Sequence, residues 1–303
     1  MKVLVLSGQD NDVNIQHALA IGAVDFIAKP AEPELLLARL QHHQRLHEID
    51  QQRDAQKFIP IVGDSIPMQM VKNQISQFAD SPFPVLIEGD SGTGKELVAR
   101  ALHENSKRSQ EPYLAINCAA IAPDLLEAQL FGHAKGAFTG ASQEHKGFFI
   151  EVGKGTLLLD ELGELPMALQ GKLLRVIESG EFYRIGETRE LQSQARIIAA
   201  TNKNLSEEIM SGNFRNDLYH RLSILNIKLP PLNQRGDDVF LLLNTFIESY
   251  AETVSPFILD DGARELWQQY DYPGNVRELR NIVIRLGTKY PGQSVSKQQL
   301  SCE

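Results

Sequence analysis

The residues Gly89–Lys95, with the sequence GDSGTGK, restrict the possible folds of this chain more than any other feature. They fit the pattern G-x-x-x-x-G-K, follow an apolar run that begins at Pro84, and precede a helical pattern at residues 96–108. In a strand–loop–helix unit of this kind, backbone N–H groups surround phosphates, the helix N-terminus favours anions, and the lysine reaches the terminal phosphates. The alternative is a glycine-rich turn with a solvent-exposed lysine. The flanking strand and helix favour the phosphate-binding loop.

Short apolar runs alternate with helical patterns up to about Leu229, which indicates an α/β fold with a parallel sheet. The runs lie at residues 84–90, 113–118, 155–161 and 196–202, and each closes on polar residues. From Asp237 onward the pattern is helical, with helices expected at residues 237–252, 261–270 and 275–286. We therefore expect an α/β part at 59–232 and a helical part at 233–303.

The acidic pair Asp160-Glu161 follows the apolar run TLLL, at the carboxyl end of a predicted buried strand. Ligands of open α/β sheets bind at that edge. Asp160 is positioned to hold Mg²⁺, directly or through water, and Glu161 to polarise an attacking water. A solvated strand end is the alternative, but it explains two adjacent acids poorly. Glu96 stands where a Ser or Thr usually ligates Mg²⁺, so the metal would depend on these carboxylates.

Two further strands are also expected to end on polar side chains, Asn117 in one and Thr201-Asn202 in the other. Each Asn alone is equally well explained as a turn or cap residue. Together with the phosphate loop and the acidic pair, however, they place four polar strand ends at one edge of the sheet, which describes a site.

Residues 213–222, NFRNDLYHRL, are expected to form a helix with an apolar stripe. Arg215 and Arg221 are six residues apart and would diverge by about 120° around its axis, so they cannot form a same-face pair. Either both are ordinary surface arginines, or one or both reach a nucleotide. Arginines supplied across a subunit boundary contribute about 10³–10⁵ in rate where such fingers exist.

Residues 1–48 form a separate short segment with a β-α-β-α pattern. Strands are expected at 3–8 and 24–30, and a parallel sheet this small cannot cover its own edges. The polar stretch 49–58 is either a linker or a continuation of the preceding helix.

Composition restricts the function further. The net charge is −9 and no run of Lys or Arg is present, so DNA binding by this chain alone is not expected. No apolar run approaches the roughly 20 residues that span a bilayer, and the N-terminus lacks a signal-peptide pattern. Cys118 and Cys302 match no metal-binding spacing, which favours a reducing cytoplasm.

Five motifs, in this order, resemble the AAA+ domain of sigma-54-dependent transcriptional activators, the bacterial enhancer-binding proteins of the NtrC type. They are GDSGTGKE, GAFTGA, GTLLLDE, FRNDLYHRL and YPGNVREL, and the resemblance extends from about Ile59 to Leu300. The phosphate loop of this family also reads GKE, so Glu96 is no departure from it. The resemblance implies an AAA+ P-loop NTPase: an α/β nucleotide-binding subdomain at 59–232 and a helical lid at 233–303.

The resemblance also implies a role for each matching residue. Asp160 and Glu161 would be the Walker B pair, with Asn117 as the switch partner of Glu161. Arg215 and Arg221 would act on the ATP of a neighbouring subunit in a ring, expected to be a hexamer. Four groups of residues would hold ATP. Val62 and Gly63 would lie near the adenine, Thr201 and Asn202 at the sensor I position, and Arg277 at the sensor II position. The phosphate loop and the start of its helix would supply Gly89, Asp90, Ser91, Gly92, Thr93, Gly94, Lys95, Glu96 and Leu97.

The stretch GAFTGA would be the tip of a loop that contacts sigma-54 when ATP is bound. It comprises Gly136, Ala137, Phe138, Thr139, Gly140 and Ala141. Its two glycines would allow a tight exposed turn that presents Phe138 and Thr139 as a small apolar contact, hidden or raised according to the nucleotide. The alternative is a buried loop with Phe138 in the core.

Residues 1–48 resemble the C-terminal half of a response-regulator receiver domain, with Ser7 as the switch hydroxyl and Lys29 before Pro30 on the fifth strand. The phosphoacceptor Asp of that family lies upstream of this half, so control by phosphorylation is not expected. Residues 292–303 are too short for the helix-turn-helix that family members usually append, which agrees with the expectation of no DNA binding.

Three hypotheses about function remain. The first is an ATPase that remodels sigma-54 RNA polymerase and drives a closed promoter complex to open. The second is a non-catalytic nucleotide-binding module that modulates full-length activators in mixed oligomers. The third, an AAA+ protein that acts on another client, is disfavoured by GAFTGA.

Overall fold

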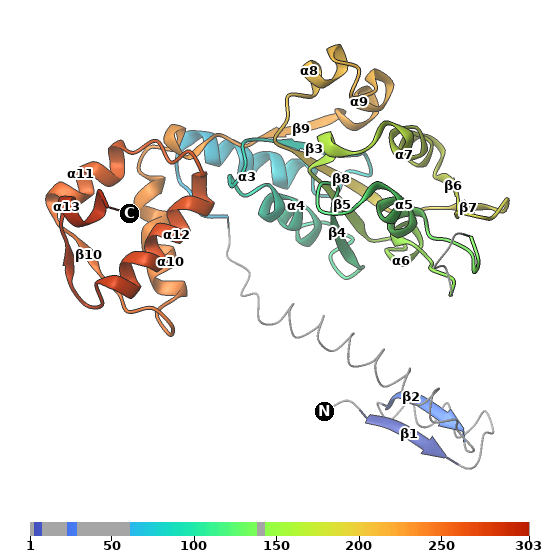
Figure 1. The fold of residues 1–303 in the computed structure, drawn as a ribbon, viewed down its shortest axis with the longest axis horizontal. Coiled ribbons are helices and arrows are strands. Elements are labelled where there is room, and N and C mark those ends of the chain that lie inside the picture. The colour runs from blue at the N-terminus through green and yellow to red at the C-terminus, as the bar shows by residue number, and fades with distance from the viewer. Residues whose placement is uncertain (1–2, 8–22, 29–60, 138–142, 303) are drawn as a thin grey trace. The chain divides into compact units, whose positions relative to one another are not determined.

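The computed structural model describes residues 3–7, 23–28, 61–137 and 143–302, and the chain divides into two units, Met1–Ile59 and Pro60–Glu303 (Figure 1). In the first unit, β1 (Val3–Ser7) and β2 (Ala23–Ala28) pair in parallel, with Ser7 opposite Ala28. Both strands expected in this segment are confirmed. The helices expected there, the stretch 49–58, Lys29 and Pro30 lie outside the described residues.

A parallel five-stranded sheet forms the centre of the second unit. Its spatial order is β4 (Tyr113–Asn117), β5 (Thr156–Asp160), β8 (Arg196–Thr201), β3 (Val85–Glu88) and β9 (Leu225–Lys228). All neighbouring strands pair in parallel, so their carboxyl ends share one edge. The four apolar runs expected as strands are β3, β4, β5 and β8, and the α/β fold is confirmed.

Helices cover both faces of this sheet, as Figure 1 shows. They and the shorter elements between the strands are α3 (Ile66–Phe78), α4 (Lys95–Glu104), α5 (Pro123–Phe131), α6 (Phe148–Glu151), the 3-10 helix η1 (Leu162–Glu164), α7 (Met167–Ser179), the antiparallel pair β6 (Glu181–Tyr183) and β7 (Glu190–Gln192), α8 (Leu205–Met210) and α9 (Asn216–Leu222).

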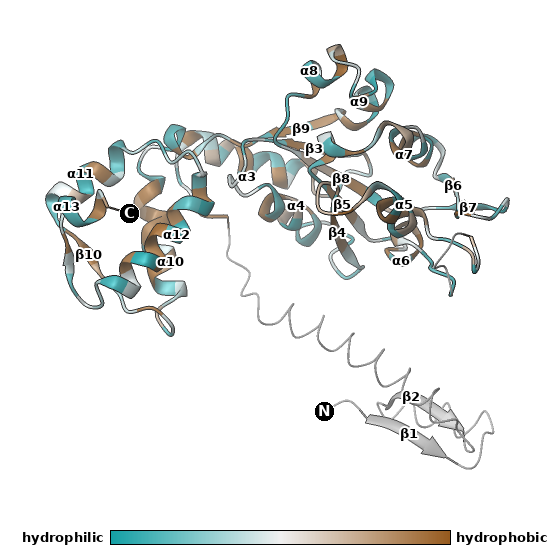
Figure 2. Cartoon of the chain, in the orientation of Figure 1, coloured by the Kyte–Doolittle hydropathy of each residue, from teal (hydrophilic) through white to brown (hydrophobic). Residues whose placement is uncertain are grey.

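The strand residues alternate between two apolar clusters, one on each face of the sheet. Leu157 and Leu159 pack with α5, α7 and α9, whereas Leu158 packs with α3 and α4. All three leucines are 0% exposed. This two-residue period is the geometry of a strand, and covering both faces explains why each run is apolar throughout. The strands accordingly appear brown in Figure 2.

The C-terminal part of the second unit is helical. It comprises the 3-10 helix η2 (Leu232–Gln234), α10 (Asp238–Ser249), α11 (Asp261–Gln269), α12 (Asn275–Lys289) and α13 (Lys297–Leu300), with a small parallel pair of β10 (Ile258–Leu259) and β11 (Ser294–Val295). The three helices expected from the sequence are confirmed. Among the described residues, no helix has both the length and the apolar character needed to cross a membrane.

Candidate nucleotide-binding site

The loop Gly89–Lys95 joins β3 to α4, as its sequence predicts. Lys95 is the first residue of α4 and is 7% exposed. Its Nζ donates hydrogen bonds to the carbonyl oxygens of Gly89, at 2.9 Å, and Asp90, at 3.2 Å. Gly94 precedes the helix and makes no side-chain cap, so the first-turn N–H groups of α4 have no capping side chain. Free N–H groups at a helix N-terminus are the arrangement that binds phosphate.

The acidic pair lies at the carboxyl end of β5, beside the end of β4. Asp160 is paired in register with Asn117, whose Nδ2 donates to Asp160 Oδ2 at 3.4 Å. The Oδ1 of Asn117 accepts the backbone N–H groups of Ala119, at 2.9 Å, and Ala120, at 3.1 Å. Asn117 therefore contacts Asp160 here, and its pairing with Glu161 stays a prediction.

Glu161 has a left-handed backbone, with φ 51° and ψ 46°, where the chain leaves β5 and enters η1. A non-glycine residue in this region costs about 1–2 kcal/mol and persists only where its surroundings hold it, which is common at functional sites. Burial lowers the pKa of Lys95, and the carboxylates of Glu161 and Asp160 oppose this shift. The acidic pair and the loop lysine are therefore close enough to interact electrostatically.

Thr201 and Asn202 lie at the end of β8, the strand between β3 and β5. Thr201 is buried, its carbonyl oxygen accepts the N–H of Gly89 at 3.3 Å, and its Oγ1 accepts the N–H of Lys203 at 3.1 Å. Asn202 is exposed. The structure thus places all four predicted polar strand ends at one edge of the sheet.

The helical part contacts the phosphate loop through the start of α12. Arg277 donates from Nη1 to Ser91 Oγ at 3.1 Å, and its backbone N–H donates to the carbonyl of Gly92 at 3.3 Å. Asn275, which is buried and has φ 54°, donates to the carbonyl of Ser91 at 3.0 Å and accepts the N–H of Leu232 at 2.8 Å. The predicted sensor II residue therefore lies against the loop.

Two residues of this contact were not predicted, Asn275 and Arg235. Arg235 is 2% exposed and donates from Nη2 to the carbonyl of Thr93 at 2.9 Å, and from Nε and Nη2 to the carbonyl of Pro230. Burial lowers its pKa to about 10, so it keeps its charge at neutral pH. A Pro-Gly-Asn turn was a signal for Asn275, whereas nothing in the sequence around Arg235 distinguishes it from a surface arginine.

Gly92→Ala is expected to destabilise the contact between the loop and α12. Gly92 has φ 77°, and a Cβ there would overlap the carbonyl oxygen of Gly274. We expect the substitution to lower the free energy of unfolding by about 1–3 kcal/mol more than Gly94→Ala, because overpacking adds to the backbone strain. Gly94 is the matched control, since it has φ 105° but a Cβ there would meet nothing within 4 Å. Equal losses in denaturant unfolding would contradict this assignment.

Val62 and Gly63 precede α3, and Gly63 lies beside Asp238, the first residue of α10. Asp238 Oδ1 accepts the N–H groups of Asp64, at 2.7 Å, and Ser65, at 3.0 Å. A Cβ on Gly63 would lie 2.7 Å from Asp238 Oδ2, so only glycine allows this approach. The segment predicted to lie near the adenine is thereby fixed to the helical part, while its contact with a base stays a prediction.

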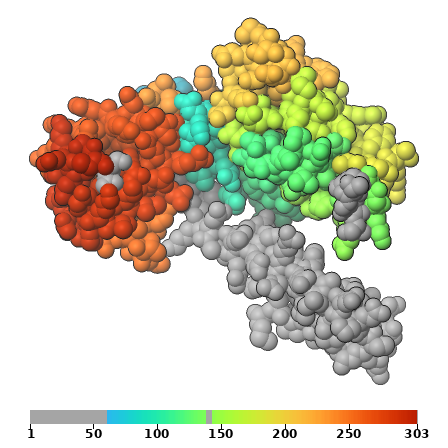
Figure 3. Space-filling model, in the orientation of Figure 1, coloured from blue at the N-terminus to red at the C-terminus, as the bar shows by residue number. Residues whose placement is uncertain are grey.

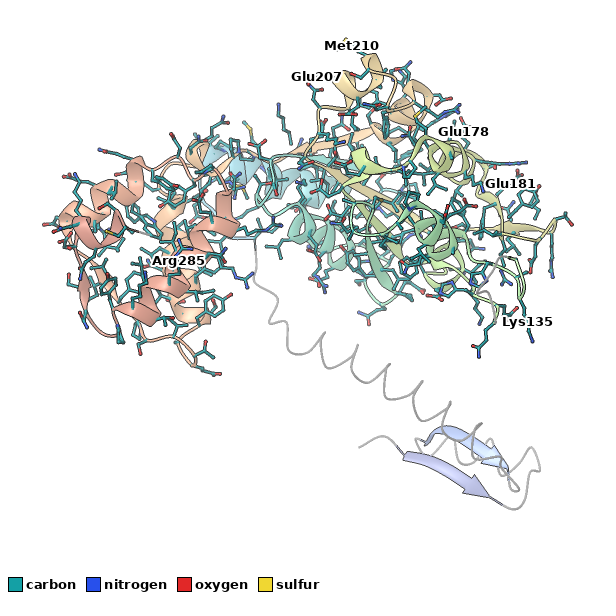
Figure 4. The ribbon with its side chains drawn as sticks, in the orientation of Figure 1. Lys135, Glu178, Glu181, Glu207, Met210 and Arg285 are labelled. Carbon is teal, nitrogen blue, oxygen red and sulfur yellow. The ribbon has the colours of Figure 1, made fainter. Side chains whose placement is uncertain are left out.

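The stretch GAFTGA is described only at its first two residues, Gly136 and Ala137; Phe138, Thr139, Gly140 and Ala141 lie outside the described residues. The base of this loop is held by backbone pairing of His133 with His145 and with Ile185, which follows β6. The rings of the two histidines stack with centroids 5.9 Å apart. Lys135, labelled in Figure 4, lies on the described part of the loop. Backbone hydrogen bonds therefore join the described residues before and after the predicted contact surface.

Arg215 and Arg221 lie on the segment 205–222, which forms part of the outer surface drawn yellow-orange in Figure 3. Arg215 forms a two-point ion pair with Asp217, at 3.0 and 2.6 Å, and lowers the pKa of that carboxyl to about 2. Arg221 Nε donates at 2.8 Å to Glu178, near the C-terminal end of α7 (Figure 4). Both guanidinium groups therefore bind surface carboxylates, and neither of these hydrogen bonds is made to the phosphate loop.

The helix expected over residues 213–222 begins only at Asn216. Arg215 precedes it with an extended backbone, φ −79° and ψ 132°, so the expected separation of about 120° around one axis does not apply. The expected apolar stripe of Phe214, Leu218 and Leu222 is buried. The two arginines thus leave the chain from different local structures.

Comparisons with known proteins agree with this geometry. Residues 61–228 match the family model described as the sigma-54 interaction domain, and residues 233–303 match the AAA+ ATPase lid domain. The chain is 41% identical to the transcriptional regulatory protein ZraR of Klebsiella oxytoca, over 98% of this chain and 68% of that protein. It is 40% identical to the DNA-binding transcriptional regulator NtrC of Rhizobium meliloti, over 100% of this chain and 63% of that protein.

A solved structure supports the fold. NtrX from Brucella abortus in complex with ATP superposes with a TM-score of 0.75 at 32% identity, covering 98% of this chain and 70% of that one. The chain spans between about half and two thirds of the length of the curated relatives that it matches. The second unit has the AAA+ P-loop NTPase fold with a helical lid. The chain therefore belongs to the sigma-54 interaction domain family of transcriptional activators.

Proposed function

We propose that this chain is an ATP-hydrolysing activator that remodels sigma-54 RNA polymerase and drives a closed promoter complex to open. The observation that carries the proposal is the position of Lys95, Asp160 and Glu161 at one sheet edge, in a chain of the sigma-54 interaction domain family. The ATP in the similar NtrX structure supports ATP as the nucleotide.

ATP binding would use groups that now contact one another. Lys95 Nζ would exchange the carbonyl oxygens of Gly89 and Asp90 for phosphate oxygens of greater negative charge. The first-turn N–H groups of α4 would complete the phosphate site. Arg277 of α12 contacts the same loop. It would bind the terminal phosphate and so couple the bound nucleotide to the position of the helical part.

Hydrolysis requires a water aligned with the terminal phosphate. Glu161 would accept a proton from that water, and Asp160 would hold Mg²⁺. No group of three or more His, Cys, Asp or Glu side chains suited to a metal ion occurs among the described residues. Mg²⁺ usually keeps several waters and binds one or two carboxylates plus phosphates, so this acidic pair fits it.

Arg215 and Arg221 would complete the ATP site of the neighbouring subunit in a ring. Both guanidinium groups are exposed and held by surface carboxylates. Exposed ion pairs contribute little to stability, so they can be exchanged for phosphate oxygens. The ring, proposed to be a hexamer, would place these groups at each subunit boundary.

Thr139→Ala is expected to leave ATP hydrolysis unchanged and to abolish sigma-54-dependent transcription, because Thr139 would contact sigma-54 and not the nucleotide. The measurement compares the ATPase rate with open-complex formation at a sigma-54 promoter. Thr139→Ser, which keeps the hydroxyl, is the matched control and should retain part of the transcription. Loss of both activities in Thr139→Ala would instead assign Thr139 a structural role and remove support for the contact.

A further inference from the structure

Gln170, on α7, is a polar side chain that is 0% exposed. Its Nε2 donates to the carbonyl oxygens of Leu165, at 2.8 Å, and Asn213, at 2.9 Å. Its Oε1 accepts the backbone N–H of Arg215 at 2.8 Å. The amide thus uses both of its donors and its acceptor, as burial demands.

These three hydrogen bonds join segments that are distant in the sequence. Leu165 directly follows η1, the short helix that begins after Asp160 and Glu161. Asn213 and Arg215 lie just before α9. The segment that leaves the acidic pair is therefore connected, through one side chain, to the segment that carries an arginine.

Apolar packing alone would not fix this connection. Leu169 and Leu173 of α7 share a buried cluster with Leu218 and Leu222 of α9. The hydrophobic effect that drives such packing is non-directional. The hydrogen bonds of Gln170 are directional, so they determine where the chain enters α9.

The hydrogen bond from the N–H of Arg215 to Gln170 holds the backbone from which the guanidinium side chain extends. Arg215 is the N-cap of α9, and the N–H of such a residue has no partner within the helix. Gln170 supplies that partner. The guanidinium passes over α7, where a Cβ on Gly171 would lie 3.6 Å from Arg215 Nη1. The backbone and the side chain of Arg215 therefore both follow the position of α7.

We propose that Gln170 is a positioning residue for Arg215, which links the acidic pair of one subunit to the arginine that this subunit offers to its neighbour. The inference rests on the proposed function, because it requires an arginine that acts in trans. A misplacement of about 1 Å can change a rate by about 10²-fold, so a side chain that touches neither nucleotide nor water can still control hydrolysis.

A mixing experiment with full-length chains tests this role. Glu161→Ala subunits retain their arginines but should not hydrolyse ATP, whereas Arg215→Ala/Arg221→Ala subunits retain the acidic pair but lack the arginines. Mixed rings should recover hydrolysis, since the first kind of subunit donates arginines to the second. Gln170→Met, which removes all three hydrogen bonds at similar length, is then placed in either partner.

The expected result is asymmetric. Gln170→Met in the Glu161→Ala donor should lower hydrolysis by the mixture between about tenfold and about 100-fold, because Arg215 is displaced. The same substitution in the arginine-free acceptor should lower hydrolysis much less, because that subunit supplies no arginine and loses only the bond to the segment after its acidic pair. Gln77→Met, at an exposed glutamine of α3, is the matched control and should change neither arm. Equal losses in both arms, or no loss in the donor, would overturn the role of Gln170.

Failure of the proposed function gives a different result. Without recovery in the mixture that keeps Gln170, the arginines do not act in trans, and this inference falls with them. If Gln170→Met does not fold, Gln170→Asn repeats the experiment, since its amide is one methylene shorter and draws the acceptor away from the N–H of Arg215. The larger defect should again occur in the donor arm. Equal defects in both arms would contradict the proposal.

Discussion

Glu161→Ala is expected to abolish ATP hydrolysis while leaving ATP bound. Proton transfer by a positioned side chain contributes about 10²–10⁴-fold, and we expect a loss of this size in the steady-state rate. The binding of ATP should persist, because Lys95 and the N-terminus of α4 hold the phosphates without help from Glu161. Alanine tolerates φ 51° no better than glutamate, so the backbone strain, and with it the melting temperature, should change little.

A neighbouring acid provides the control for this experiment. Glu164 lies three residues further on in η1, is exposed, and pairs with Lys203 at 3.0 Å. Glu164→Ala should hydrolyse ATP at the wild-type rate. Equilibrium binding of a fluorescent ATP analogue and phosphate release are measured on both variants. If Glu161→Ala hydrolyses ATP at the wild-type rate, Glu161 takes no part in the reaction. If the wild-type chain binds ATP without hydrolysing it, the chain is a non-catalytic module.

Local patterns were sufficient to predict the sheet edge. Apolar runs that close on polar residues predicted β3, β4, β5 and β8, because buried strands need apolar side chains on both faces. The motif Gly89–Lys95 and the pair Asp160-Glu161 occur at the ends of such runs, and a parallel sheet brings those ends together. The carboxyl ends of parallel strands share one edge whatever the strand order, so local signals determined the location of the site.

The start of α9 shows where local patterns fail. The apolar stripe continues back to Phe214, so periodicity predicted a helix from residue 213. The chain instead stays extended at Arg215, whose N–H is bonded to Gln170 on another helix. Arg235 escaped prediction for the same reason, since its partner, Thr93, is more than a hundred residues away. The residues next to such a side chain in the sequence give no sign of a partner so far along the chain.

The double substitution Arg215→Ala/Arg221→Ala is expected to cause the largest loss of activity, about 10³–10⁵-fold in the hydrolysis rate, if both guanidinium groups stabilise the charge that develops on the neighbour's phosphate. The wild-type rate per subunit should rise with protein concentration as rings form, whereas the rate of the variant should stay low at every concentration. Binding of ATP by the isolated subunit should not change.

Arg175→Ala is the matched control for that substitution. Arg175 also lies on the surface, on α7, and forms an ion pair with Glu181 at 3.5 Å, so its loss removes one of the two positive charges that the double variant loses. Its rate should follow that of the wild type across the concentration series. If the wild-type rate per subunit is independent of concentration, or if the double variant keeps its activity, the arginines act in no neighbouring site. Asp217 and Glu178 would then hold them as permanent surface ion pairs.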